Sequence, residues 1–240
     1  MDNIFISFSG AAREEYALKF LNFFNRFGLH GWYDQHELLL GDVLKENIDK
    51  NGIQKVDYCV LIINQSFLSR HWPCEEAIRL YNRFEEKRDF VIFPILLDIT
   101  KEDLKNSRLN FLLSIKYQFL RTGETIDQIA YQILNRIFFD IASHSKFQTL
   151  NDALGYFKRL TLTNSVDFFN ALSALSNFDE TDYRDKVIFL ICLIRLLNGN
   201  PYEKAVREIS YYIYDNRDIS FDMYKIIESI FLITASTFAA

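Results

Sequence analysis

Three short segments of this chain combine polar, aromatic and glycine residues where a ligand site is expected. Phe8-Ser9-Gly10, the stretch 34–42 and the stretch 66–76 each follow directly after a short apolar run. Ligands of open α/β sheets collect outside the carboxyl ends of the strands, so these three segments are expected to meet at one edge of a sheet. They therefore supply the candidates for binding and catalysis.

Several common sites are excluded by the motifs that the sequence lacks. The chain contains no G-x-G-x-x-G, G-x-x-x-x-G-K-[ST], H-E-x-x-H or G-x-S-x-G motif, so standard nucleotide cradles, zinc-protease sites and hydrolase elbows are not expected. Its three cysteines, Cys59, Cys74 and Cys192, form no C-x-x-C pair. We therefore predict neither a disulfide framework nor a metal site.

Composition and charge narrow the class of protein further. The chain has 240 residues, 49% of them hydrophobic, which is enough for a sizeable core. Its net charge of −5 offers no basic field to hold a phosphate backbone, so direct nucleic-acid binding is not expected. The longest uncharged runs, 187–194 and 229–240, are shorter than the roughly 18 apolar residues that a membrane helix needs. We expect a cytoplasmic protein without membrane contact.

The first part of the chain has the pattern of an α/β domain, which we predict over residues 1–145. Short apolar runs alternate there with amphipathic periods, as in a parallel sheet covered by helices. Strands are expected at 3–8, 31–33, 56–63, 90–97 and 117–120. Helices are expected at 12–27, 42–50, 74–86 and 125–144.

The remainder, residues 146–240, has the pattern of an all-α domain. Helical periods follow one another at 149–160, 165–176, 183–197, 202–214 and 221–235, with Asp182 among the plausible N-caps. The uncharged end, 229–240, is either a buried last helix or a contact for another chain. This domain carries no catalytic constellation, so regulation or oligomerisation is its expected role.

Three blocks of the first domain resemble a TIR (Toll/interleukin-1 receptor) domain of the bacterial NADase and immune-effector type. NIFISFSG is similar to the first-strand box, GLHGWYDQHELLLGDVL to the second strand with its BB loop, and SFLSRHWPCEEAIRL to the W-x-x-x-E helix start. Val43 stands where the family usually has Ser, and Ala77 where it usually has Leu. The resemblance covers residues 3 to about 145 and implies a flavodoxin-like domain.

This resemblance implies cleavage of NAD⁺ at its nicotinamide N-glycosidic bond, with NAD⁺ as substrate and no cofactor. Cyclisation of the ADP-ribose product is a variant, and a non-catalytic TIR scaffold or a nucleotide-binding sensor is the alternative. The W-x-x-x-E spacing selects Glu76, four residues after Trp72, as the catalytic residue. Nicotinamide leaves as a neutral molecule, so one carboxylate that stabilises the oxocarbenium-like charge suffices. The plain alternative for Glu76 is a solvated glutamate in the first turn of a helix.

Other residues of the three segments are candidates for substrate binding. Trp72, Trp32 and Phe8 offer rings that stack on a ligand, although Trp32 fits a core position better. Asp34 either accepts a hydrogen bond from a ribose hydroxyl or terminates the strand as a turn residue.

Ser9 and Gly10 either present backbone N–H groups to phosphate oxygens or cap the following helix. The candidate assembly loop, which mediates TIR–TIR packing in the family, consists of Leu38, Leu39, Leu40, Gly41 and Asp42. Bacterial fusions of this kind resemble assembly-activated anti-phage effectors. A homo-oligomer is therefore expected, with the helical domain receiving a partner protein or a second messenger.

Overall fold

A five-stranded parallel sheet forms the centre of the first part of the protein. The structure, a computed structural model, describes residues 3–10, 12–33, 56–87, 90–160, 166–175 and 182–240. The strands are β1 (Asn3–Ser7), β2 (His30–Trp32), β3 (Tyr58–Ile63), β4 (Val91–Leu97) and β5 (Gln118–Leu120). Their order, β2-β1-β3-β4-β5, is that of a flavodoxin-like doubly wound sheet, which confirms the predicted fold class.

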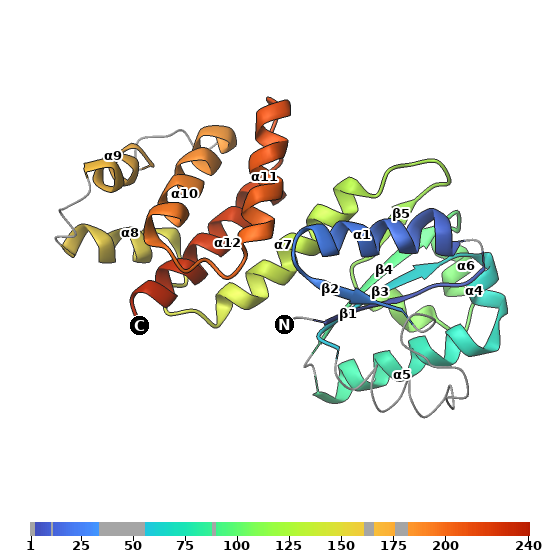
Figure 1. Cartoon of the computed structure of the whole chain (residues 1–240). Helices are drawn as coiled ribbons and strands as arrows, with labels where there is room; N and C mark the ends of the chain where they lie inside the picture. Colours follow the sequence, from blue (N-terminus) through green and yellow to red (C-terminus); the bar gives the residue numbers. More distant parts are fainter. Residues whose placement is uncertain (1–2, 11, 34–55, 88–89, 161–165, 176–181) are drawn as a thin grey trace, which may run out of the picture. The chain divides into compact units, whose positions relative to one another are not determined.

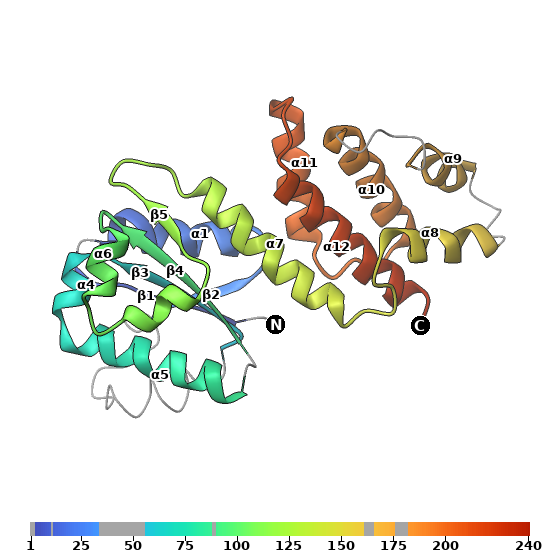
Figure 2. The same ribbon diagram turned by 180° about the vertical axis from the view of Figure 1, so that it is seen from behind.

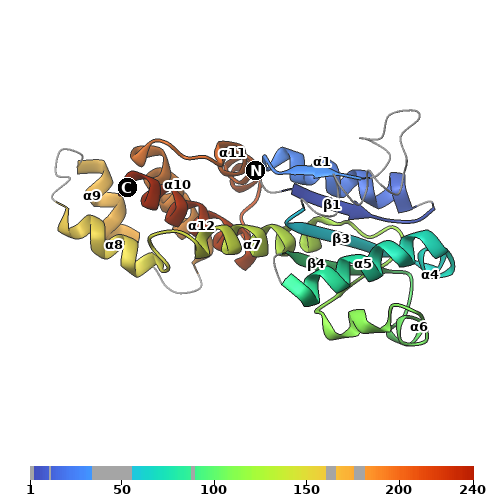
Figure 3. The ribbon, with the colours of Figure 1, turned by 90° about the horizontal axis from the view of Figure 1, so that it is seen from below.

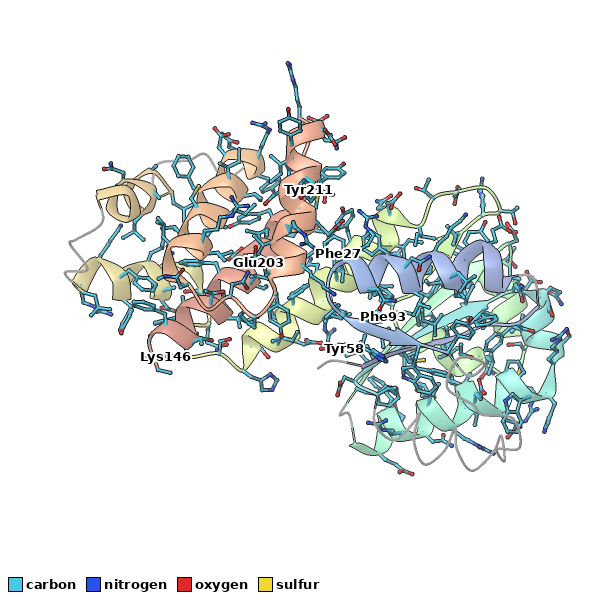
Figure 4. The ribbon with its side chains drawn as sticks, viewed as in Figure 1. Phe27, Tyr58, Phe93, Lys146, Glu203 and Tyr211 are labelled. Carbon is cyan, nitrogen blue, oxygen red and sulfur yellow. The ribbon has the colours of Figure 1, made fainter. Side chains whose placement is uncertain are left out.

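The sheet is buried on both faces. Every residue of β3 is buried, which explains why its sequence, YCVLII, is continuously apolar rather than alternating. Helix α1 (Leu18–Arg26) covers one face and α5 (His71–Lys87) covers the other (Figure 1). Tyr58 and Phe93 stack between β3 and β4, with their ring centroids 6.3 Å apart (Figure 4).

The helices of this part depart from the prediction in detail. A π-helical turn, η1 (Arg13–Ala17), precedes α1 where one continuous helix was expected. Three short elements were not predicted, because five residues are too few to establish a helical period: α4 (Gln65–Ser69), α6 (Lys101–Lys105) and the 3₁₀ helix η3 (Asn110–Ser114). The helix predicted at 42–50 lies outside the described residues.

The chain divides into two compact units. Unit 1 comprises Met1–Asn25 and Leu29–Ala130, and unit 2 comprises Arg26–Gly28 and Tyr131–Ala240. The division falls within helix α7 (Asp127–Ser143), which Figure 2 shows from behind. The boundary predicted at residue 145 lies at the end of this helix and stays a prediction.

Unit 2 contains the five helices predicted after residue 146. They are α8 (Leu150–Arg159), α9 (Val166–Leu175), α10 (Tyr183–Leu197), α11 (Glu203–Asp215) and α12 (Phe221–Phe238). The expected N-cap of α10 is confirmed, since the side chain of Asp182 accepts a hydrogen bond from the backbone N–H of Asp185 at 3.2 Å. Helix α12 packs against α10 and α8 (Figure 3).

Helix α12 is the interior helix of unit 2. Its residues 226–232 are all buried, a pattern that requires neighbours on every side. Of the two alternatives for the uncharged end of the chain, the buried helix therefore holds for the stretch that leads to Ala235. Near the end of α12, Lys146 donates a hydrogen bond to the carbonyl oxygen of Ala239 at 2.9 Å (Figure 4). Helix α11 lies at the surface of the unit, where the side chain of Tyr211 is 63% exposed. No helix within the described ranges is both long and apolar enough to cross a membrane.

Candidate active site

The carboxylate of Glu76 is buried against the sheet. Glu76 lies in α5, is 5% exposed, and accepts a hydrogen bond from the hydroxyl of Ser7 to its Oε2 at 3.1 Å. Ser7 is the last residue of β1, so this contact joins a helix to a strand end 69 positions away in the sequence. The burial excludes the alternative of an ordinary solvated glutamate.

The strand pattern explains why Ser7 faces α5. Side chains alternate along a strand, so Ser7 shares its face with Phe5. Phe5 belongs to a buried cluster that also contains Cys74, Ala77 and Leu80 of α5. Ser7 thus brings a hydroxyl to an otherwise apolar contact between β1 and this helix.

Cys59 of β3 is a further neighbour of the carboxylate. It pairs in register with Phe5 of β1 and is completely buried. Burial raises the pKa of the Cys59 thiol well above its ordinary value, and the negative charge of Glu76 raises it further. The thiol therefore stays neutral, and it is a small uncharged side chain near Glu76.

The adjacent glutamate, Glu75, has a different environment. Its Oε1 accepts a hydrogen bond from the guanidinium of Arg108 at 2.5 Å and lies 3.9 Å from Nδ1 of His71. The hydrogen bond from Arg108 lowers the pKa of the Glu75 carboxyl. Successive residues of an α-helix point about 100° apart, so one glutamate forms a surface ion pair while the next turns toward the sheet.

Trp72 lies one helical turn before Glu76 and is 36% exposed. Residues four apart in a helix share a face, so the indole and the carboxylate lie on the same side of α5. The guanidinium of Arg79 lies 5.9 Å from the centroid of the indole ring. An exposed ring beside a buried carboxylate fits the stacking role predicted for Trp72, which stays a prediction.

Trp32 occupies a core position. It is 9% exposed, and its ring centroid lies 4.7 Å from that of Phe5 within the buried cluster. Phe8 is half-buried and contacts Tyr33 edge to face, with the centroids 5.4 Å apart. Between the alternatives for Trp32, these contacts favour the core, and ligand stacking by Phe8 stays a prediction.

Ser9 and Gly10 connect the end of β1 to the end of β3. The Oγ atoms of Ser9 and Ser66 lie 3.2 Å apart, and the amide of Asn64 donates to the carbonyl oxygen of Ser9 at 3.4 Å. Gly10 has a φ of +66°, and a Cβ there would lie 3.1 Å from Oγ of Ser66. The positive φ thus favours glycine, and a Cβ at this position would also require the side chain of Ser66 to shift slightly.

The remaining predicted residues of this region, Asp34 and the assembly loop of residues 38–42, lie outside the described residues.

Ser7 is a residue of the candidate site that the sequence analysis did not single out. Its contact with Glu76 joins β1 to α5. The signal that identifies Ser7 is its alternation with Phe5, which places one hydroxyl on an apolar strand face.

A small polar cavity lies at the same edge of the sheet. Its volume is about 220 Å³, and its lining includes neither Glu76 nor Trp72: Ala12, Glu15, Asn64, Gln65, Ser66, Leu97, Asp98 and Thr122. Asp98 accepts hydrogen bonds from the backbone N–H and the hydroxyl of Thr122, and the hydroxyl bond in particular lowers the pKa of the Asp98 carboxyl. Within the described residues, no group of His, Cys, Asp and Glu is arranged to hold a metal ion.

Comparison with known proteins relates the first part of the chain to one family. A family model described as TIR domain matches residues 4–134. The chain is 31% identical over 136 residues to a probable 2' cyclic ADP-D-ribose synthase, TcpO, of Methanobrevibacter olleyae, covering 56% of this chain and 38% of that protein. It is 28% identical over 131 residues to the NAD(+) hydrolase TcpC of Escherichia coli O6:H1, covering 55% and 42%.

A third relative is the 2' cyclic ADP-D-ribose synthase AbTIR of Acinetobacter baumannii. The identity is 29% over 138 residues, covering 56% of this chain and 50% of that protein. The chain thus spans half or less of the length of these curated relatives. The similarity lies in unit 1 and the beginning of α7, since the family match ends at residue 134.

Proposed function

Because this chain belongs to the TIR domain family, we propose that it is an NAD⁺ nucleosidase that cleaves the nicotinamide N-glycosidic bond. The relatives with matching segments are named as an NAD(+) hydrolase and as 2' cyclic ADP-D-ribose synthases. In this proposal NAD⁺ is the substrate, and the products are nicotinamide with either ADP-ribose or a cyclic ADP-ribose.

The observation that carries the proposal is the position of Glu76, buried beside the carboxyl end of β1 while Glu75 pairs with Arg108. When the bond between the anomeric carbon and nicotinamide breaks, its electron pair returns to the pyridinium nitrogen and the leaving group departs neutral. Positive charge then develops on the ribose. A preorganised carboxylate stabilises that charge.

The second half of the reaction adds an oxygen nucleophile to the anomeric carbon. Water as the nucleophile gives ADP-ribose, and a hydroxyl of the ADP-ribose itself gives a cyclic product, each with release of one proton. Glu76 serves both outcomes, because its charge acts on the cationic ribose before the nucleophile arrives.

The test is incubation of purified protein with NAD⁺ and chromatographic separation of nicotinamide, ADP-ribose and cyclic products. We expect Glu76→Gln to lower nicotinamide release by at least about 100-fold, the cost of removing one preorganised electrostatic group. Glu75→Gln is the matched control and should retain activity. Equal loss in both variants would contradict the assignment of Glu76, and a wild-type protein that releases no nicotinamide would support a scaffold or sensor instead.

We further propose that activity depends on a homo-oligomer formed through TIR–TIR contacts that involve residues 38–42. Specific activity should then rise with protein concentration, and Leu39→Asp should flatten that rise without unfolding the protein. A concentration dependence that survives this substitution would remove the loop from the mechanism.

The division of labour that we propose follows the predicted domains, with catalysis in residues 1–145 and control in residues 146–240. An immune effector of this kind would use the helical part to sense a partner protein or a second messenger. The three cysteines are free thiols, which suits the cytoplasm as the place of action.

A further inference from the structure

Ser7 is the one hydroxyl on its face of β1, and packing alone does not account for it. The residue is 3% exposed and pairs in register with Leu61 of β3, which is fully buried. Phe5 on the same face and Leu61 beside it both belong to the apolar cluster under α5. A small apolar residue would fit such a position, whereas a hydroxyl there must be hydrogen-bonded. The hydroxyl of Ser7 donates a hydrogen bond to Oε2 of Glu76 at 3.1 Å.

Burial acts against the ionised form of Glu76. A carboxylate that is moved out of water favours its neutral form, and a hydrogen bond donated to the charged form opposes this effect. The dipole of α5 contributes little, because Glu76 lies beyond the first turn of the helix, where the dipole effect has fallen off. A donor from another element is therefore valuable at this position.

We propose that Ser7 is a positioning residue for Glu76, and that its hydroxyl holds the carboxylate in one orientation and in its ionised form. The inference rests on the proposed function of Glu76, which requires negative charge beside the ribose. Ser7 itself need not touch the substrate. It acts through the oxygen to which it donates, and this role accounts for a buried hydroxyl between an apolar strand and an apolar helix face.

Other titratable and charged groups lie around Glu76 on the elements packed there. One of them is the thiol of Cys59 on β3, whose raised pKa keeps it neutral. On α5 the carboxylate of Glu75 is engaged by Arg108, and Arg79 lies over the ring of Trp72. Ser7→Ala leaves all of these groups in place, so a change in the titration of Glu76 reports the loss of the hydroxyl.

The first experiment is the pH dependence of kcat for NAD⁺ cleavage in wild type, Ser7→Ala and Ser7→Thr. Removing a donor to the charged form raises the pKa of Glu76, so the acid limb of the profile should move to higher pH in Ser7→Ala, by about one to two pH units. Relative to wild type, the loss of activity in Ser7→Ala should therefore be largest on the acid limb and smallest well above it. Ser7→Thr, which keeps the hydroxyl, should restore the wild-type limb.

Ser114→Ala is the matched control. It removes a serine hydroxyl of unit 1 that donates to the carbonyl oxygen of Phe111 and does not contact Glu76. Its acid limb should coincide with that of wild type. A Ser7→Ala enzyme whose activity falls by the same factor at every pH, with an unmoved limb, would overturn the proposal, because Ser7 would then have only a structural role.

A second measurement does not depend on catalysis. Protein labelled with ¹³C at the glutamate carboxyl carbons is titrated by NMR, and the Glu76 signal is assigned by its disappearance in Glu76→Gln. The Glu76 titration should move to higher pH in Ser7→Ala and stay in place in Ser114→Ala. An unchanged titration refutes the role of Ser7 even in an active enzyme, whereas absence of nicotinamide release from wild type refutes only the proposed function.

Discussion

The buried polar side chains Thr234 and Glu228 of α12, in unit 2, find their partners differently from those at the end of β1, in unit 1. In α12 of unit 2, the hydroxyl of Thr234 donates to the carbonyl oxygen of Ile230 at 2.8 Å, and Lys225 pairs with Glu228 at 2.5 Å. Each of these contacts lies within one helical turn. In unit 1, Ser7 contacts Glu76 across 69 positions of the sequence, and Ser9 contacts Ser66 across 57.

This difference distinguishes polar groups that only support a helix from polar groups that the fold assembles into a candidate functional site. A helix satisfies its own buried polar groups when they are three or four residues apart, so they impose nothing on neighbouring elements. Polar groups that meet from distant elements are held by the fold itself. Glu228 pairs with the cation of Lys225 three residues away on its own helix, whereas Glu76 accepts a hydrogen bond from a hydroxyl on a strand 69 positions away.

The largest expected effect in this comparison is a loss of stability when each buried glutamate is replaced by glutamine. We expect Glu228→Gln to lower the free energy of unfolding by about 1–3 kcal/mol, because Lys225 loses its charged partner in a largely buried setting, although its 32% exposure moderates the cost. Glu76→Gln should cost less, since the amide oxygen still accepts from Ser7 while turnover is lost.

Urea unfolding followed by circular dichroism measures both variants. The two tryptophans, Trp32 and Trp72, lie in unit 1, so their fluorescence reports that unit separately. If Glu76→Gln proves the more destabilising change, the contrast between a structural and a functional carboxylate fails.

A smaller effect tests how tightly the carboxyl edge of the sheet is built. Gly10 and Gly123 both have positive φ, +66° and +88°, so alanine at either position should cost about 1 kcal/mol in backbone strain. A Cβ at Gly10 would also lie 3.1 Å from Oγ of Ser66, whereas a Cβ at Gly123 would have no heavy atom of the described residues within 4 Å. Thermal unfolding should therefore show Gly10→Ala to be less stable than Gly123→Ala. Equal melting temperatures would mean that the edge tolerates the extra carbon.

The smallest effect concerns Asp98 at the polar cavity. Hydrogen bonds from Thr122 hold the pKa of Asp98 below its ordinary value, so they stabilise the fold above pH 4, and this contribution is lost as the pH falls through the native pKa. Thr122→Val removes the hydroxyl donor. The variant should melt at a lower temperature at pH 7 and lose less further stability between about pH 5 and 2. If the melting temperatures of wild type and Thr122→Val fall by the same amount across this pH range, the hydrogen bond from the hydroxyl does not contribute to the pH dependence of stability.

Much of the fold follows from local pattern. All five strands were expected, and β3 and β4 show the pattern most clearly, because buried parallel strands are nearly continuous apolar runs. Helix α10 was predicted with its bounds, Tyr183–Leu197, because Asp182 caps it and its apolar period is regular. The π-helical turn Arg13–Ala17 was not predicted, since five residues do not distinguish its period from that of an α-helix. The end of the chain had two interpretations, which the burial of residues 226–232 separated.

The sequence by itself determined the order of elements, the spacing from Trp72 to Glu76 and the apolar faces, because these depend on residues close together in the chain. Only the tertiary structure decided that Glu76 rather than Glu75 turns toward the sheet, and that Ser7 meets it there. The physical reason is that a hydrogen bond across 69 positions exists only once β1 and α5 have packed on a common apolar cluster, and no local pattern encodes that distance.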